Sequence, residues 1–148
     1  MFYLDTSVVA AYYCPEPLSE EIEVFLTTNG QMAISNLTEV ELFSAVARKV
    51  RERGLSKSDA IRIHATFLAH LDNQLYTLVP LVEQHYKLAR DWIGMLNNTL
   101  RTLDALHLAV AASEGITLVT ADHGLAKSAR VLGLAPVVIG EVTCVPER

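Results

Sequence analysis

Five short apolar runs separated by helical patterns constrain the fold of this chain more than any other feature. The runs cover residues 2–4, 32–34, 76–79, 116–120 and 137–139, and all are rich in β-branched or aromatic residues. Such runs are typical of strands, and those that lack polar alternation indicate strands buried on both faces. Because helical segments separate them, the pattern predicts an α/β fold with a mainly parallel central sheet covered by helices.

The segments between the runs carry apolar residues three or four positions apart, which predicts helices. Residues 37–53 form one predicted helix that ends at Gly54, and Ser56 caps a second helix that continues to about residue 74. Because a short turn joins them, we expect an antiparallel hairpin. Residues 101–115 are apolar nearly all round and predict a central helix packed on the sheet. The expected apolar faces of the hairpin are Val40, Phe43, Ala47 and Val50 on its first helix and Ile61, Ala65 and Leu68 on its second. The stripe of Val40, Phe43 and Ala47 fits either a partner surface or the core.

Length and composition predict a single domain over residues 1–148 with an ordinary hydrophobic core. The two cysteines, Cys14 and Cys144, form no CxxC pair, so the sequence signals neither a zinc site nor a disulfide framework, and we expect a cytoplasmic protein. The longest uncharged runs are too short to span a membrane. A formal net charge of −5 argues against nucleic-acid binding by the whole surface but leaves a local basic site open.

Four acidic residues follow predicted strands or precede one closely, near the sheet edge where α/β proteins bind ligands. Two carboxylates about 4 Å apart repel by roughly 4 kcal/mol at an effective dielectric of about 20, so four gathered acids do not all stay ionised unaided. Either some bind protons, or a divalent cation neutralises them, and oxygen ligands without cysteine favour Mg²⁺ or Mn²⁺ over zinc. The four acids are Asp5, Glu41, Asp104 and Asp122.

Three of these acids also have a purely structural interpretation. Asp5 is a good N-cap for a helix over residues 6–13. Asp104 complements the positive end of its helix after an N-cap at Thr102, and Asp122 is a turn residue before Gly124. The site is absent only if the structural interpretation of every acid holds at once.

The position of Glu41 has two alternatives. Thr38 and Glu41 have the spacing of a capping box, in which the Glu side chain reaches back to the backbone. Asn36 and Glu39 have the same spacing, so Glu39 is a rival for the site. From helix periodicity alone, we expect only one of the two glutamates to face the sheet edge.

Histidine could supply a different ligand chemistry. His107 lies three positions after Asp104 on nearly the same helix face, but no HxxxH or HExxH pair accompanies it. We therefore expect a core histidine or a neighbour of the ligands rather than a metal ligand, and we place His123 in a solvated turn. The chain has no GxxxxGK[ST], GxGxxG or GxSxG motif, which argues against the nucleotide-binding and hydrolase sites that these motifs form.

The four acidic segments resemble those of the PIN-domain nucleases, and in particular the VapC toxins of toxin–antitoxin pairs. The segment "LDTSVV" resembles the family's first strand and first acid, and "ISNLTEVEL" resembles the segment with the second acid. "TLDALHLAVA" and "LVTADHGL" resemble the segments with the third and fourth. The match covers essentially the whole chain, and the family's spacing from Ser35 selects Glu41 over Glu39.

The resemblance implies a PIN-like α/β/α sandwich and a Mg²⁺- or Mn²⁺-dependent endoribonuclease that cleaves single-stranded RNA. It also implies a homodimer that a small VapB-like antitoxin neutralises. Asp5, Glu41, Asp104 and Asp122 are then the catalytic and metal-binding residues, with Thr6, Ser7 and Thr120 positioning water or phosphate. We expect Arg48, in the basic run 47–53, to position the substrate; a solvated helix face is the alternative.

Three other functions fit parts of the pattern. One is a PIN-type nuclease of RNA maturation or decay that has no antitoxin. The second is a catalytically silent PIN-like module that binds RNA or protein, against which the presence of all four acids argues. The third is a metal-dependent phosphatase that acts on small phosphoesters.

Overall fold

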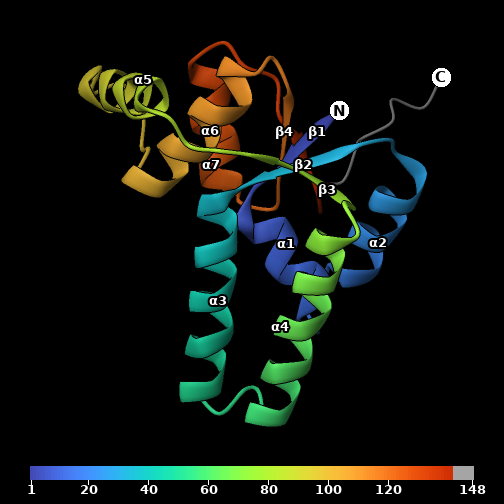
Figure 1. Cartoon of the computed structure of the whole chain (residues 1–148). Coiled ribbons are helices and arrows are strands. Elements are labelled where there is room, and N and C mark those ends of the chain that lie inside the picture. Colours follow the sequence, from blue (N-terminus) through green and yellow to red (C-terminus); the bar gives the residue numbers. More distant parts are fainter. Residues whose placement is uncertain (142–148) are drawn as a thin grey trace, which may run out of the picture.

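The computed structural model describes residues 1–141 of the chain. Helices and strands alternate along these residues, as the apolar runs predict (Figure 1). In chain order the elements are β1 (Phe2–Leu4), α1 (Thr6–Tyr13), α2 (Ser19–Thr28), β2 (Met32–Ser35), α3 (Asn36–Arg51), α4 (Lys57–Asp72), β3 (Tyr76–Val79), α5 (Glu83–Gly94), α6 (Thr102–Ser113), β4 (Thr117–Thr120), α7 (His123–Val131) and β5 (Val137–Val138).

The strands form one sheet in the order β3-β2-β1-β4-β5, and all neighbouring strands are parallel. The first strand lies at the centre, where Tyr3 is in register with Ala33 on one side and Leu118 on the other. The predicted α/β fold with a parallel sheet is confirmed. Because the strands run in one direction, their carboxyl ends meet at the same edge, and the segments after β1, β2 and β4 are neighbours there.

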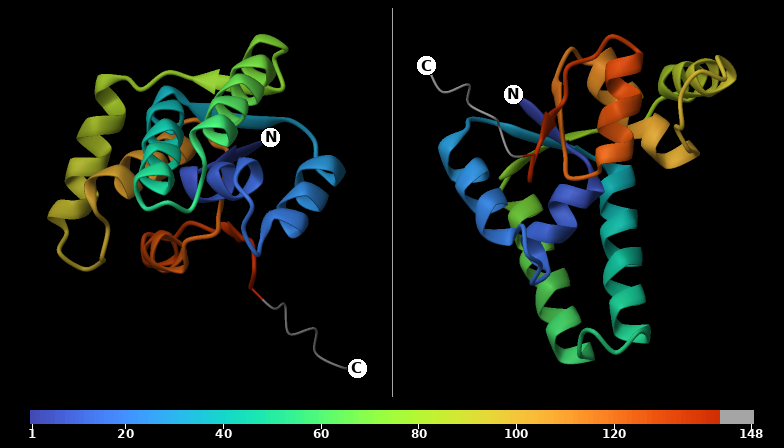
Figure 2. Two further views of the ribbon diagram at one scale, coloured as in Figure 1. Left: turned by 90° about the horizontal axis from the view of Figure 1, so that it is seen from below. Right: turned by 180° about the vertical axis from the view of Figure 1, so that it is seen from behind.

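Helices cover both faces of the sheet (Figures 1 and 2). One apolar core contains Leu4 and lies between the sheet and α1 to α4, while a second contains Tyr3 and lies between the sheet and α5 to α7. Successive residues of a strand point to opposite faces, which explains this division between two adjacent residues. Helix α6 is buried over most of its length, so the predicted central helix is confirmed.

Helices α3 and α4 form the predicted antiparallel hairpin and project away from the sheet (Figure 1). Ser56 caps α4 by accepting a hydrogen bond from the Asp59 backbone N–H at 3.0 Å. The turn before it includes Arg53, which adopts a left-handed backbone conformation with φ 59°. The two helices meet where the Phe43 and His64 rings stack with centroids 4.0 Å apart.

The predicted apolar face of α4 was wrong in rotation, and that of α3 was right only in part, because Phe43 and Val50 pack against the core while the other two residues do not. Helix α3 buries Thr38, Leu42 and Val46, whereas Val40 is 69% exposed and Ala47 is also exposed. Helix α4 buries Ala60 and Phe67, whereas Ile61 is 67% exposed. Both helices carry apolar residues on more than one face. Periodicity alone does not show which face is buried, and the packing of the helices against α1 and β3 decides it.

Two further predictions concern single residues. Arg101, not Thr102, is the N-cap of α6, and its side chain makes no capping hydrogen bond. Cys144 lies outside the described residues, while Cys14 is free and buried at the end of α1.

None of the helices in residues 1–141 combines the length and apolar character that crossing a membrane requires.

Candidate active site

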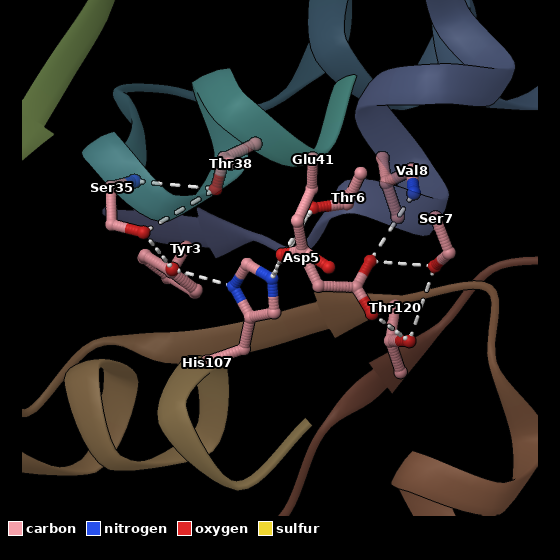
Figure 3. A network of polar contacts seen from close by, with 10 residues as sticks. All are labelled: Tyr3, Asp5, Thr6, Ser7, Val8, Ser35, Thr38, Glu41, His107 and Thr120. Carbon is pink, nitrogen blue, oxygen red and sulfur yellow. Dashed lines mark hydrogen bonds and ion pairs between the residues drawn. The ribbon is translucent and has the colours of Figure 1, made fainter. Parts of the chain in front are cut away.

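Asp5 lies at the end of the central strand with a side chain only 3% exposed. Its Oδ1 accepts hydrogen bonds from the Ser7 hydroxyl at 2.6 Å and from the Val8 backbone N–H at 3.2 Å, and its Oδ2 accepts one from the Thr120 hydroxyl at 2.5 Å (Figure 3). The predicted N-cap role is therefore confirmed. The cap uses only part of the carboxylate, since the hydroxyls of Ser7 in α1 and of Thr120 in β4 also converge on it.

Burial raises the pKa of Asp5, and the neighbouring His107 together with the hydrogen bonds to the carboxylate opposes that rise. The ionised form is therefore costly, because burial removes the water that would stabilise its charge. A cation placed beside this carboxylate stabilises the charged form.

Glu41 faces the same edge from α3. Ser35 is the N-cap of this helix and forms a capping box with Thr38, so Glu41 does not make the predicted capping interaction. Instead its Oε1 accepts hydrogen bonds from the Thr6 hydroxyl at 3.0 Å and from Nε2 of His107 at 2.5 Å. The structure thus places Glu41, and not Glu39, beside the residues that follow β1.

Asp104 and Asp122 approach the same region from α6 and α7. Burial raises the pKa of Asp104, and the charges of Asp122 and Glu41 raise it further, while Arg101 partly opposes them. Asp122 is the N-cap of α7, with its Oδ1 accepting hydrogen bonds from the backbone of Gly124 and Leu125. Asp122 therefore has the predicted turn role and is also an electrostatic neighbour of Asp104.

Ser7 and Thr120 connect Asp5 to the loop that carries Asp122. The Ser7 hydroxyl oxygen accepts a hydrogen bond from the Ala121 backbone N–H at 2.9 Å, and the Thr120 hydroxyl oxygen accepts one from the Asp122 N–H at 2.9 Å. Both hydroxyls donate to Asp5 at the same time. The loop that carries the fourth acid is thus held by the same two side chains that hold the first.

The acids do not form a closed metal cage in this conformation. Within residues 1–141, no three His, Cys, Asp or Glu side chains are grouped closely enough to hold an ion as they stand. The donor set itself, carboxylate and hydroxyl oxygens, is the type that Mg²⁺ and Mn²⁺ prefer. The four-acid metal site therefore stays a prediction.

His107 and Tyr3 belong to this site although only the first was singled out, and then only as a core residue or a neighbour of the ligands. His107 is almost fully buried and contacts Glu41 through Nε2 and the Tyr3 hydroxyl through Nδ1. One sequence signal for Tyr3 is its position two residues before Asp5, which puts both side chains on one side of an extended segment.

Arg48 lines a hollow of about 300 Å³ beside the acids. Glu41 and Thr6 line one part of it, and Arg51, which was not singled out, joins Arg48 on α3. Positions 41, 44, 48 and 51 are spaced by three or four residues, so these side chains follow one face of the helix away from the carboxylates. The remaining lining residues are Ser44, Ala45 and Leu103.

The other histidines lie away from the acids or at the surface. Nδ1 of His70 forms a 2.6 Å hydrogen bond with the Tyr13 hydroxyl. His85 is buried in α5, and the ring of His64 stacks on that of Phe43. His123, at the start of α7, is well exposed, as predicted for a solvated turn.

Comparison with known protein families identifies the fold. The model of the PIN domain matches residues 2–131, which include all four acids. The chain belongs to the PIN domain family. This membership confirms the resemblance.

Individual relatives align over nearly the full length of the chain. The chain is 35% identical over 149 residues to "Ribonuclease VapC47" of Mycobacterium tuberculosis, covering 96% of this chain and 99% of the relative. It is 33% identical to "Ribonuclease VapC46" of the same species, covering 90% and 93%.

Solved PIN-domain structures share the fold at lower sequence identity. M. tuberculosis VapC20, described as a Sarcin-Ricin loop cleaving toxin, superposes with a TM-score of 0.72 at 16% identity, covering 93% of this chain and 99% of that chain. A chain of FitAcB from Neisseria gonorrhoeae superposes with a TM-score of 0.70 at 20% identity, covering 96% and 100%.

Proposed function

We propose that this protein is a metal-dependent endoribonuclease of the VapC type that cleaves single-stranded RNA. The observation that carries the proposal is the approach of four acids, from four separate segments of the chain, to one edge of a PIN-domain sheet. Relatives that align over nearly the full length of the chain are named ribonucleases, which supports RNA as the substrate.

In this proposal Asp5, Glu41, Asp104 and Asp122 hold Mg²⁺ or Mn²⁺. A bound divalent cation lowers the pKa of a water molecule and stabilises the charge that builds on the scissile phosphate. The raised pKa of Asp5 and of Asp104 supports this role, because burial disfavours the charged form of both carboxyls and a cation would offset that penalty. Ser7 and Thr120 hold Asp5 in place, and the Thr6 hydroxyl orients Glu41.

The hollow beside Glu41 suits the RNA backbone. Arg48 and Arg51 line it, and their guanidinium groups supply positive charge in a chain whose formal net charge is −5. Guanidinium groups bind phosphate through paired N–H donors, which fixes the position of the strand without reading its bases. In this proposal, arginines that bind the RNA backbone lie next to the carboxylates that hold the metal ion.

A small antitoxin is the partner that we propose for the α3–α4 hairpin. Val40 and Ile61 expose apolar side chains there although both lie on well-packed helices. Other structures with this fold are described as toxin–antitoxin assemblies, including a complex from Klebsiella pneumoniae that covers 82% of this chain with a TM-score of 0.62. We also propose a homodimer, as the resemblance of the sequence to the VapC toxins implies, that acts in the cytoplasm.

The function is tested by incubating the purified chain with single-stranded RNA and with DNA of the same sequence. Mg²⁺, Mn²⁺ and EDTA define the metal arms, and Asp5→Asn and Asp104→Asn define the site arms. Asp91→Asn is the matched control, because it makes the same change at an exposed position of α5. We expect RNA cleavage only with metal, and only in wild type and the control. Cleavage that persists in EDTA or in both site variants contradicts the proposal, and hydrolysis of a small phosphomonoester but not RNA identifies a phosphatase.

A further inference from the structure

A chain of buried polar groups lies behind Glu41. The Tyr3 hydroxyl is 2.8 Å from the Ser35 hydroxyl and 2.7 Å from Nδ1 of His107, whose Nε2 is 2.5 Å from Oε1 of Glu41 (Figure 3). Tyr3 and Ser35 are fully buried and His107 is nearly so. This series of hydrogen bonds connects the buried core at the sheet edge to Glu41, the one acid among the residues that line the hollow with Arg48 and Arg51.

The partners determine the direction of these hydrogen bonds. An ionised carboxylate only accepts, so Nε2 of His107 carries the proton that it donates to Glu41. In a neutral imidazole the other nitrogen then accepts, and the Tyr3 hydroxyl is the donor that reaches Nδ1. The Tyr3 oxygen is left to accept from Ser35. Every group in the series from Ser35 to Glu41 thus has a partner of the right type.

The same hydrogen bonds leave part of Glu41 free for a ligand. The Thr6 hydroxyl and His107 both contact Oε1. Among residues 1–141, no hydrogen-bond donor contacts Oε2. The carboxylate is thus held from one side by two donors, and its second oxygen faces away from them.

We propose that Tyr3 and His107 are positioning residues that hold the Glu41 carboxylate in the orientation required to bind a divalent cation through its free oxygen. This inference rests on the proposed function and deepens it, because it assigns a role in cation affinity to two side chains that are not ligands. Partners of this kind, which orient metal ligands through hydrogen bonds, typically change metal affinity or activity by about 10–100-fold when they are removed.

The experiment measures Mn²⁺ binding by calorimetry on the full chain and uses three variants at these positions. His107→Leu removes both ring nitrogens, and we expect the dissociation constant for Mn²⁺ to rise by about 10–100-fold. His107→Gln keeps an N–H near the position of Nε2, so the affinity should return close to that of wild type. Tyr3→Phe removes only the hydroxyl, and we expect a smaller rise of the dissociation constant, by about tenfold.

A matched control separates positioning from general stability. Tyr13→Phe removes another hydroxyl that is hydrogen-bonded to a histidine, at 2.6 Å from Nδ1 of His70, but between α1 and α4 and away from the acids. We expect it to lower the melting temperature without changing Mn²⁺ affinity. In cleavage assays His107→Leu should raise the Mn²⁺ concentration for half-maximal rate, while the KM for RNA stays unchanged.

The outcomes separate this inference from the function on which it rests. Wild-type protein that neither binds Mn²⁺ nor cleaves RNA overturns the proposed function and the inference with it. Wild type that binds Mn²⁺, together with folded His107→Leu and Tyr3→Phe variants of unchanged affinity, overturns only the inference. If His107→Leu does not fold, Tyr3→Phe decides, and wild-type affinity in that variant overturns the positioning role.

Discussion

The Thr120 hydroxyl donates a 2.5 Å hydrogen bond to Oδ2 of Asp5, joining residues that lie 115 positions apart. The Thr120 hydroxyl oxygen also accepts a hydrogen bond from the Asp122 backbone N–H. Replacing Thr120 with Val keeps the shape but leaves Oδ2 of a buried carboxylate without its donor. Such unsatisfied groups cost about 1–3 kcal/mol or more when charged. For Thr120→Val we expect the free energy of unfolding, measured in urea, to fall by that amount and RNA cleavage to slow. Thr120→Ser should keep the wild-type stability and cleavage rate. A Val variant as stable and active as the Ser variant would contradict this role.

Asp5→Asn should separate catalysis from folding. Asn caps helices about as well as Asp, so the hydrogen bond from the Val8 N–H survives while the negative charge is lost. We expect RNA cleavage and Mn²⁺ binding to be lost with little change in melting temperature. Asp5→Ala removes the cap as well and should cost about 1 kcal/mol more. If cleavage survives in the Asn variant, Asp5 is a structural cap only.

The acids also predict a pH dependence of stability in EDTA. The pKa of Asp104 is raised in the folded protein above its ordinary value of 3.8, by burial first and then by Asp122. The folded state thus binds the proton more tightly, so the contribution of Asp104 to stability is fully present below pH 3.8 and is lost as the pH rises through the folded pKa. Asp104→Asn should therefore gain stability relative to wild type across this window, as measured by urea unfolding at several pH values.

Mn²⁺ should reverse this trend in wild type. Carboxylates must be deprotonated to bind a cation, so metal affinity rises with pH. We expect the increase in melting temperature caused by Mn²⁺ to grow with pH in wild type and to be much smaller in Asp104→Asn. An equal increase in both proteins at every pH would place the cation elsewhere.

Arg48 and Arg51 should contribute to RNA binding in proportion to their charge. For single strands, the logarithm of affinity falls with the logarithm of salt concentration by about 0.7 per neutralised phosphate. We expect Arg48→Ala and Arg51→Ala each to weaken binding of an uncleaved RNA at low salt and to reduce this slope by about that amount. Arg62→Ala, on the exposed side of α4, is the matched control. A slope that changes equally in all three variants indicates only an effect of net charge.

The rotation of α3 can be tested with two alanine substitutions. Leu42 is fully buried, so Leu42→Ala should cost about 2–5 kcal/mol of unfolding free energy. Val40 is 69% exposed, and Val40→Ala should change it by less than about 0.5 kcal/mol. Val40→Ala should instead weaken binding of a cognate antitoxin, measured by titration of the purified partner. The opposite ranking of the two stabilities would mean that the predicted face is the buried one after all.

The amino-acid pattern predicted most of the fold because short apolar runs and helix caps are local signals. The strand at residues 76–79, the cap at Asp5 and the α3–α4 hairpin all follow from neighbours in sequence. The face that each hairpin helix buries could not be predicted in this way. Leu42 and Val40 are both apolar, and only the position of α1 decides which of them meets the core.

The same division applies to the candidate site. The sequence by itself determined which acids follow the strands, since the carboxyl ends of parallel strands share one edge. It also left Glu41 and Glu39 as rivals, because residues two positions apart point to nearly opposite sides of a helix and the sequence does not show which side faces the sheet edge. The tertiary structure alone decided that His107 and Tyr3 lie behind Glu41, and that Thr120 donates to Asp5. Hydrogen bonds between residues 35 to 115 positions apart depend on how the sheet brings its strands together, and no local pattern encodes that geometry.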